Sequence, residues 1–539
     1  MNTAESRLAM QLRPVGGSRA STEAPRRIEI LAALSLAIDL GLGQPMEHML
    51  RAALIGMRLS DMLGLDDSTR QRVFYTNLLA WIGCHADSFE LAALFGDDIG
   101  FRRAYYSIDA RGLPLLNLLL RRTGAERDAP RRAIARSRFL LVARSVMLTT
   151  IRSHCASAVS LADRVGLDHG LSPILGCTFE RWDGHGMPDG LRGDQIPLEM
   201  RVAHVADLGE IALRTGTPEH AAGTIRARSG TQFDPHVVEA FCRHVNEFAA
   251  ELDGVDLWPL AIDQGGDHLR LSGSALDTVL TAIGDFADLK SPYTAGHSRA
   301  VADLVCRAAD AWHPADAEPL RRAGWLHDLG RLGVSNSIWD KPGPLTELER
   351  ERMRAHPYFT ERIVMRIPGL QRESQLAGSH HERIDGSGYP RGTGSSLDRG
   401  QRLLAVADAY QSSLEPRPYR TAVSSVVAAE RIRDEVRDGR LDVRAADAVL
   451  GVAGHQPQRG HDLPAGLTTR EGQVLALICQ GLSDREIAER LVITPKTARN
   501  HVEHIYVKID ARNRVGATLF AIEHDLVVGT SSIDGASAS

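Results

Sequence analysis

Residues 325–334 read WLHDLGRLGV and place a histidine directly before an aspartate, at His327 and Asp328. More histidines lie on both sides of this pair, and with one later aspartate they form the set His297, His327, Asp328, His356, His380, His381 and Asp408. Imidazole and carboxylate together suit iron, manganese or zinc, whereas a structural zinc site usually includes thiolates. Seven ligands are too many for one ion, so we predict two divalent ions, iron or manganese in preference to zinc. Asp328 is the natural bridge between them.

Chance clustering is the main alternative, because the chain has 21 histidines and an isolated histidine is usually a surface or core residue. Two doublets argue against chance: His327 with Asp328, and His380 with His381. They are separated by about the length of a helical hairpin. The turn sequence GSGYP at residues 386–390 is a further motif that does not depend on the histidines. We therefore interpret the set as a metal centre of the kind that hydrolyses a phosphoester.

The composition is that of an ordinary water-soluble protein, with 43% apolar and 24% charged residues and a net charge of -5. Apolar residues recur at helical spacing, which predicts an all-α chain. Six scattered cysteines without a CxxC pair indicate a reduced compartment, and we expect a cytoplasmic protein. The apolar run at residues 30–43 is interrupted by Asp39, so we expect no membrane partner.

A chain of 539 residues is too long for one hydrophobic core, and two stretches rich in linker residues divide it into three folded blocks. We predict two helical bundles followed by a smaller helical domain. The expected boundaries are a flexible N-terminus at 1–27, a first block at 28–252, a second block at 272–450, a linker at 451–462, a third block at 463–528 and a disordered tail at 529–539.

The first two blocks resemble two copies of one unit. FERWDGHGMPDG at residues 179–190 mirrors HERIDGSGYPRG at 381–392, and MRVAHVAD at 200–207 mirrors QRLLAVAD at 401–408. The first copy has Gly83 and Cys84 in place of the His-Asp pair, and Thr178 and Phe179 in place of the paired histidines. We predict that it is non-catalytic. Packing against the second copy, dimerisation and holding a small ligand remain open as its role.

The second block resembles the HD-GYP family of metal-dependent phosphohydrolases, through HD at 327–328, KPGPLT from residue 341, HHERIDGSGYP from 380, VADAY ending at 410 and RPYR from 417. Members of that family are all-helical, and most characterised ones cleave cyclic di-GMP. The resemblance implies one ion on His297, His327 and Asp408, and the other on His356, His380 and His381. It places Asp328 between them.

Three positions depart from the family pattern. Arg331 stands where a lysine is usual, which keeps a positive charge for a substrate phosphate. Tyr293 replaces a glutamate that members with a third metal carry, so two ions are expected. Gln411 replaces a second aspartate, which points to an altered substrate pocket.

We predict that Asp328 and Arg331 act in catalysis. The expected substrate contacts are Arg331, Lys341, Arg383, Gly388, Tyr389 and Pro390. For the three cations the alternative is a solvated basic face.

The third block contains the helix-start signals that are typical of a helix-turn-helix. Ser483 with Glu486 forms a capping box, and Thr494 with Pro495 provides an N-cap and a first-turn proline for the next helix. The block resembles the four-helix LuxR-type DNA-binding domain. That resemblance implies double-stranded DNA as a partner, with contacts from Lys496, Thr497, Arg499, Asn500, Lys508 and Arg514. A protein-docking bundle is the alternative, because residues 467–527 hold eight Lys/Arg against eight Asp/Glu.

The leading hypothesis is a cyclic di-GMP phosphodiesterase coupled to a DNA-binding transcription regulator. A rival is a regulator that binds a cyclic dinucleotide without cleaving it, and a third possibility is a phosphohydrolase of another nucleotide. By analogy with other DNA-binding modules of this kind, we expect a homodimer.

Overall fold

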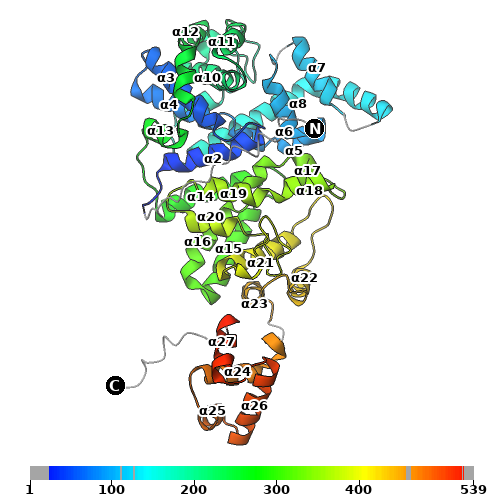
Figure 1. Cartoon of the computed structure of the whole chain (residues 1–539). Helices are drawn as coiled ribbons and strands as arrows, with labels where there is room; N and C mark the ends of the chain where they lie inside the picture. Colours follow the sequence, from blue (N-terminus) through cyan, green and yellow to red (C-terminus); the bar gives the residue numbers. More distant parts are fainter. Residues whose placement is uncertain (1–22, 110–111, 125–127, 457–462, 525, 527–539) are drawn as a thin grey trace. The chain divides into compact units, whose positions relative to one another are not determined.

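The computed structural model describes residues 23–109, 112–124, 128–456, 463–524 and 526. The chain divides into two compact units, Met1–His455 and Gln456–Ser539 (Figure 1). Within the described residues the only β-type pairings are isolated bridges, and the rest of the regular structure is helical. The predicted all-α class is confirmed.

The first block fills the N-terminal part of the larger unit. Its helices are α2 (Arg27–Gly41), α3 (His48–Met62), α4 (Asp67–Leu79), η1 (Ile82–His85), α5 (Ser88–Phe95), α6 (Asp98–Tyr106), α7 (Gly112–Arg122), α8 (Ala129–Arg164), α9 (Leu171–Leu175), η2 (Gly193–Gln195), α10 (Leu198–Thr215), α11 (Pro218–Arg226) and α12 (Pro235–Leu252). Helix α13 (Leu257–Gln264) lies in the segment that connects this block to the next.

The second block completes the larger unit. Its helices are α14 (Gly273–Asp288), α15 (His297–Trp312), η3 (Pro314–Asp316), α16 (Ala317–Leu326), η4 (Leu329–Gly333), α17 (Asn336–Trp339), α18 (Glu347–Arg354), α19 (His356–Val364), α20 (Gln371–Ala377), η5 (Gly394–Ser396), α21 (Arg399–Leu414), α22 (Ser425–Arg437) and α23 (Val443–Val452).

The two blocks share one hydrophobic core. One continuous cluster of buried apolar side chains includes residues of α2, α3 and α10 from the first block and of α14, η4 and α19 from the second. Helix α2 lies at the centre of this arrangement: 13 of its 15 residues are buried, and it contacts both η4 and α19. A second cluster, formed by α15, α21 and α23, belongs to the second block alone.

A glycine allows the His-Asp segment to lie directly against α19. A Cβ on Gly330 would come within 2.0 Å of the His356 carbonyl oxygen, so no side chain fits there. Thr360 of α19 fixes the approach, because its hydroxyl accepts from the Gly330 N–H at 2.9 Å and donates to the His327 carbonyl at 2.8 Å. This contact brings the turn after α16 next to the first residue of α19.

The smaller unit consists of η6 (Pro464–Gly466), α24 (Thr469–Cys479), α25 (Asp484–Leu491), α26 (Pro495–Lys508) and α27 (Arg514–Glu523) around its own core. The Ser483 side chain accepts from the Glu486 N–H in a capping box, and the Thr494 side chain accepts from the Thr497 N–H. The expected four-helix module with a helix-turn-helix is confirmed.

Within the described part of the chain, no single helix is both long and apolar enough to cross a membrane. One bent pair, Asp67–His85 with Ser88–Phe95, meets the length and composition criteria together.

Candidate metal centre

Five elements of the second block bring the seven predicted ligands together. His297 begins α15, His327 and Asp328 lie between α16 and η4, and His356 begins α19. His380 and His381 follow α20, and Asp408 lies in α21. All seven are buried except His381, which is partly exposed.

The ligand atoms form two separate groups, and a third group of His327, Asp328 and His380 links them. His297, His327 and Asp408 offer one set of atoms within 4.8 Å of one another, and His356, His380 and His381 offer a second. These are the two groups that the family resemblance implies.

Asp328 lies between the two groups and faces each of them with a different oxygen. Its Oδ2 is 3.0 Å from His327 Nε2 and 3.4 Å from His297 Nε2. Its Oδ1 is 3.6 Å from Nε2 of both His356 and His380. Both oxygens are buried, and apart from the ion pair of Oδ2 with Arg331 at 2.6 Å neither has a donor among the described residues other than these imidazoles. A buried carboxylate with this surrounding fits a bridge between two cations.

The histidine tautomers give an independent test of that fit. Nδ1 of His327, His356 and His380 lies 2.8, 2.6 and 2.6 Å from the carbonyl oxygens of Gly324, Met353 and Ala377. A neutral ring that donates from Nδ1 presents a lone pair at Nε2.

The Nε2 atoms then face one another in pairs, at 3.3 Å for His297 and His327 and at 3.2 Å for His356 and His380. Facing lone pairs repel unless a cation lies between them. The donor set therefore fits divalent metal ions.

Burial lowers the pKa of His356 to about 4 and that of His380 to about 3, so both rings are neutral at pH 7. The neutral ring is the form that binds a metal. Burial also opposes ionisation of Asp328, but the positive charge of Arg331, together with the neighbouring imidazoles, outweighs it and holds the pKa of this carboxyl well below its usual range. The centre thus presents lone pairs and negative charge in a buried setting.

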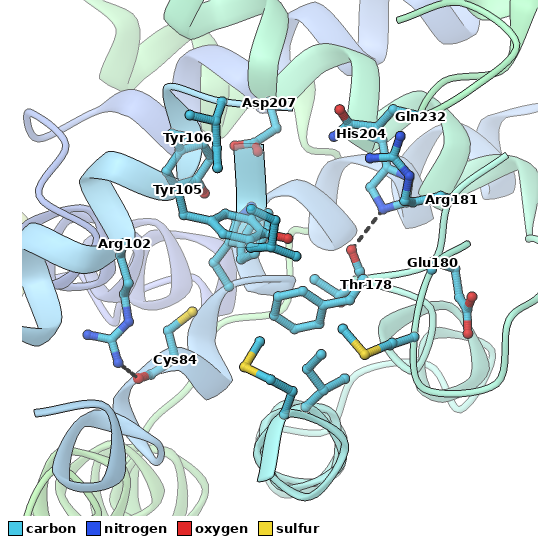
Figure 2. A pocket seen from close by; sticks show the side chains of 18 of the residues that line it. Cys84, Arg102, Tyr105, Tyr106, Thr178, Glu180, Arg181, His204, Asp207 and Gln232 are labelled. Carbon is cyan, nitrogen blue, oxygen red and sulfur yellow. Dashed lines mark hydrogen bonds between the residues drawn. The ribbon is translucent and has the colours of Figure 1, made fainter. Parts of the chain in front are cut away.

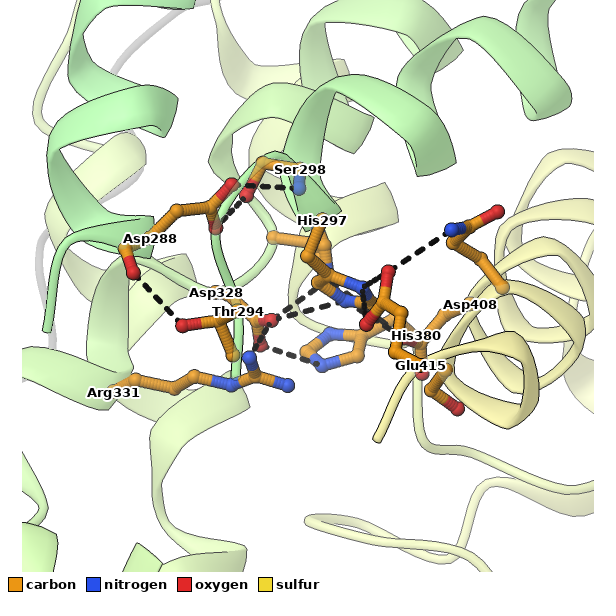
Figure 3. A network of polar contacts seen from close by, with 12 residues as sticks. Asp288, Thr294, His297, Ser298, Asp328, Arg331, His380, Asp408 and Glu415 are labelled. Atoms are coloured by element: carbon orange, nitrogen blue, oxygen red, sulfur yellow. Dashed lines mark hydrogen bonds and ion pairs between the residues drawn. The ribbon is translucent and has the colours of Figure 1, made fainter. Parts of the chain in front are cut away.

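Glu415, which our sequence analysis missed, orients His297. Its carboxylate lies 2.9 Å from His297 Nδ1, on the side of the ring away from Asp328 (Figure 3). Gln411 donates to Glu415 at 2.9 Å, and Arg417 pairs with it at 2.9 Å. Gln411, noted above as a departure, therefore supports a ligand indirectly. The only feature of the sequence that could have pointed to Glu415 is its position just before the RPYR motif at residues 417–420.

Asp288 fixes the start of α15, where His297 lies. Its two oxygens accept from the backbone N–H of Ser298 at 2.9 Å and from the Ser298 hydroxyl at 2.8 Å (Figure 3). The Thr294 hydroxyl donates to the Asp288 carbonyl at 2.8 Å. This network holds the loop before His297 without contacting the ligand atoms themselves.

Arg331 lies at the centre, as predicted. Its Nη1 is 2.6 Å from Asp328 Oδ2, and its guanidinium lies 4.1 Å from the ring centroid of Trp339. Trp339 in turn packs against His356, with ring centroids 5.4 Å apart. Trp339 is a second residue that the sequence analysis missed. Arg331 Nε has no hydrogen-bond partner among the described residues, although it is buried.

The other predicted substrate contacts lie in different surroundings. The Tyr389 ring is 4.8 Å from that of His381, next to the centre, and the Arg383 charge influences the pKa of Tyr389. Gly388 packs against its own turn, where a Cβ would meet the Arg383 nitrogen at 2.4 Å, and Pro390 follows in the same turn. Lys341 pairs with Glu349 at 2.7 Å, a contact that holds the start of α18. Direct contact of these residues with a substrate stays a prediction.

In the first block an internal ion pair occupies the place of one ligand group. His48 Nε2 lies 3.0 Å from Asp207 Oδ1, and His48 Nδ1 lies 2.6 Å from Glu210. Burial alone would lower the pKa of His48, but the two carboxylates outweigh it and raise the pKa to about 10. A protonated ring has no lone pair for a metal.

The predicted DNA contacts lie in the smaller unit. On α26, the helix after the turn, Ala498, Val502 and Ile505 are buried. Lys508 instead pairs with Glu471 at 2.8 Å, and Arg514 donates to the Leu482 carbonyl at 2.6 Å. The remaining four predicted residues are exposed side by side on α26: Lys496, Thr497, Arg499 and Asn500.

Comparison with known proteins matches both regions. Residues 282–444 match the HD domain family, and residues 465–521 match the bacterial regulatory proteins of the luxR family. The chain is 34% identical over 404 residues to the 3′3′-cGAMP-specific phosphodiesterase 3 of Vibrio cholerae, which covers 73% of this chain and 88% of that protein.

A shorter match links the chain to a cyclic di-GMP phosphodiesterase response regulator of Xanthomonas campestris, with 36% identity over 135 residues, 24% of this chain and 35% of that protein. A crystal structure of a cyclic GMP-AMP specific phosphodiesterase of Vibrio cholerae aligns with a TM-score of 0.56 and 28% identity, over 81% of this chain and 100% of that one. The chain therefore belongs to the HD-GYP group of HD-domain phosphohydrolases, and it carries a luxR-family regulatory domain at its C-terminal end.

Proposed function

We propose that the second block is a two-metal phosphodiesterase that hydrolyses a cyclic dinucleotide. The observation that carries this proposal is the position of Asp328, whose two oxygens face two separate groups of imidazoles. Two divalent ions at such a site supply an activated water and neutralise charge on the scissile phosphate. The preferred metals are iron and manganese, with zinc as the alternative.

The residues of the chain position and shield the reacting groups. Asp328 directs one oxygen toward each group of imidazoles, and its side chain is held in place by an ion pair with Arg331. The free Nε of Arg331 provides a donor for a phosphate oxygen, and Trp339 limits how far the guanidinium can turn. The Tyr389 ring lies beside His381, where it would exclude water from one side of the centre.

Cyclic di-GMP is the substrate we propose, with 3′3′-cGAMP as the alternative. The alternative has a specific motivation: the relative that matches 88% of its length is named for 3′3′-cGAMP, whereas the relatives named for cyclic di-GMP match over shorter stretches. The two molecules differ in one base. The metal centre acts on the phosphate they share, so the choice depends on base contacts away from Asp328.

The test is turnover of both dinucleotides by the full chain loaded with manganese or iron(II). We expect product from at least one of them and loss of product in Asp328→Asn. A matched control is Asp303→Asn, because Asp303 is an exposed aspartate on α15 paired only with Arg307 in the next turn. If metal-loaded protein binds dinucleotide and changes its DNA affinity without forming product, the chain is a sensor and the hydrolase proposal fails.

We further propose that the luxR-family unit binds double-stranded DNA through the exposed face of α26, as a homodimer on two half-sites. This proposal is supported by four polar side chains exposed on a helix that follows a capped turn. Arg499→Ala is expected to weaken operator binding by about 1–3 kcal/mol. Arg243→Ala, an exposed arginine in the larger unit, serves as the control. Equal loss in both variants would contradict the assignment.

A further inference from the structure

The first block contains a cavity of about 140 Å³ at the place where the second block has its metal centre. Cys84, Thr178 and Phe179, the counterparts of Asp328, His380 and His381, all line it (Figure 2). The histidine at the third ligand position, His154, directs Nε2 to the Ala80 carbonyl at 2.7 Å and packs against Phe179. At these four positions the ligand cluster is therefore replaced by apolar or neutral groups.

Aromatic rings form much of the wall. Trp81 lies edge-on to Phe179 and to Tyr106, with ring centroids 5.4 and 5.5 Å apart. Tyr105 and Met147 also line the space. A cavity of roughly 150 Å³ with apolar walls accommodates a benzene ring. The inner part of the space is thus of the size that accommodates one planar ring.

Arg181 lies at the side of the cavity where Gln232 and His204 are also found (Figure 2), and Arg228 is another lining residue. Arg181 is buried, with a relative exposure of 6%. Its Nη2 has no hydrogen-bond partner among the described residues. The charge of Arg228 interacts with the like charge of Arg181. Burial and this repulsion lower the pKa of Arg228, and the opposite charge of Asp109 partly offsets them. Asp109 pairs with Arg181 at 3.0 Å. Two guanidiniums thus share this carboxylate.

The other carboxyl groups of the wall are already engaged or neutral. Glu180 accepts from the backbone N–H groups of residues 189, 190 and 191 at 2.8, 3.1 and 2.9 Å. Asp207 pairs with His48 at 3.0 Å. Burial raises the pKa of Asp87 to about 8, so this group is mostly protonated at pH 7. Asp183 also lies 3.4 Å from Arg181 Nε, so the donor that Arg181 offers to an entering anion is its Nη2.

Two buried polar groups of the wall, the Arg181 Nη2 nitrogen and the Tyr106 hydroxyl, have no hydrogen-bond partner among the described residues, whereas buried polar groups are normally paired. We propose that this cavity binds a small ligand that combines one planar aromatic ring with an anionic group. The ring lies between Trp81, Tyr106 and Phe179, and the anion contacts Arg181 and Arg228. A mononucleotide and an aromatic carboxylate both have this chemistry. The binding claim is independent of the proposed hydrolase function.

The test is calorimetric titration of the metal-loaded full chain with two probes, guanosine 5′-monophosphate and 4-hydroxybenzoate. We expect at least one probe to bind with one-to-one stoichiometry at millimolar or lower concentration, and the probe that binds identifies the source of the anion. Arg181→Gln is expected to weaken binding by roughly tenfold or more, because it removes a charge-assisted hydrogen bond. The exposed Arg243→Gln is the matched control and should bind as the wild type does.

A second variant keeps the test decisive if Arg181→Gln does not fold. Ile151 of α8 is buried and lines the cavity without polar contacts, so Ile151→Trp would fill the space and leave the ion pairs intact. Loss of binding in this variant supports the site. Absence of binding by both probes overturns the proposal, and so does binding that survives both substitutions. Probe affinity is measured without turnover, so an inactive second block does not affect the outcome.

Discussion

Cys84 and Asp328 hold equivalent positions in the two blocks, and this is one of the differences, with Gly83, Thr178 and Phe179, that separate the first block from the candidate metal centre. Asp328 presents two oxygens on opposite sides. Cys84 presents one sulfur, and burial raises the pKa of its thiol to about 12. The thiol is therefore uncharged at pH 7 and, unlike the Asp328 carboxylate, brings no negative charge to its site.

The seven ligands could be predicted because doublets and regular spacing identify them in the sequence, and the structure brings all seven together. Glu415 and Trp339 could not. Each is a single residue with no accompanying motif, and each reaches the centre only through the packing of α21 and α17. Contacts of this kind depend on how helices pack, which periodicity does not determine.

Glu415→Gln is expected to weaken metal binding at the His297 group by roughly 10-fold to 100-fold, the usual cost of losing a carboxylate behind a histidine ligand. Competition with a chelator measures the affinity for manganese. Glu430→Gln, an exposed pair partner of Arg433 on α22, is the control. Equal affinities in the two variants would show that Glu415 does not support His297.

His48 makes the stability of the first block depend on pH. Its folded pKa of about 10 lies above the value of about 6.5 in an unfolded chain. The group therefore stabilises the fold fully below pH 6.5, and this contribution is lost as the pH rises toward 10. The difference in unfolding free energy between wild type and His48→Gln should shrink by up to about 1.4 kcal/mol per pH unit across this window. Denaturation at pH 6.5 and 9 measures it, and a constant difference would contradict the assignment.

At the scale of single elements, helix α6 contacts the second block at one end and lines the cavity of the first block at the other. Its first residue, Asp98, accepts from the Ser335 hydroxyl at 2.6 Å and the Asn336 N–H at 2.9 Å, just before α17. Its last turn supplies Tyr105 and Tyr106 to the cavity. Helix α17 ends at Trp339, which covers Arg331. One short helix thus lies between the cavity wall and the wall of the metal centre.

Thr494 is expected to set the stability of the first turn of α26. Thr494→Ala removes the N-cap and should cost about 1 kcal/mol, or roughly fivefold faster hydrogen exchange at the first amides of this helix. Thr518→Ala on α27 is a matched control, because Thr518 bonds within its helix and caps nothing. Unchanged exchange in Thr494→Ala would mean that Pro495 alone defines the helix start.

At the scale of the whole molecule, the repeat predicted two similar bundles but not the single core that joins them. The general helical spacing of the apolar residues predicted an all-α chain, but the burial of nearly all faces of α2 depends on η4 and α19 of the other block. Neither partner is near α2 in the sequence. The joint is also polar, since Asp98 pairs with Lys290 at 3.5 Å inside it.

Asp98→Ala is expected to destabilise the larger unit by roughly 3–5 kcal/mol, because it leaves the buried charges of Lys290 and Arg102 without their partner. Urea unfolding followed by tryptophan fluorescence measures the loss, and Asp303→Ala is the exposed control. A loss below about 1 kcal/mol would show that the two blocks do not depend on this joint.

The burial of α2 has a consequence for how the chain can be shortened. A gene encoding only residues 272–455 would produce a protein whose η4 and α19 expose the apolar surface that α2 covers. Exposed surface of that kind promotes aggregation. The block that lost its ligands therefore cannot be deleted without damage to the block that kept them, and its retention needs no catalytic role of its own.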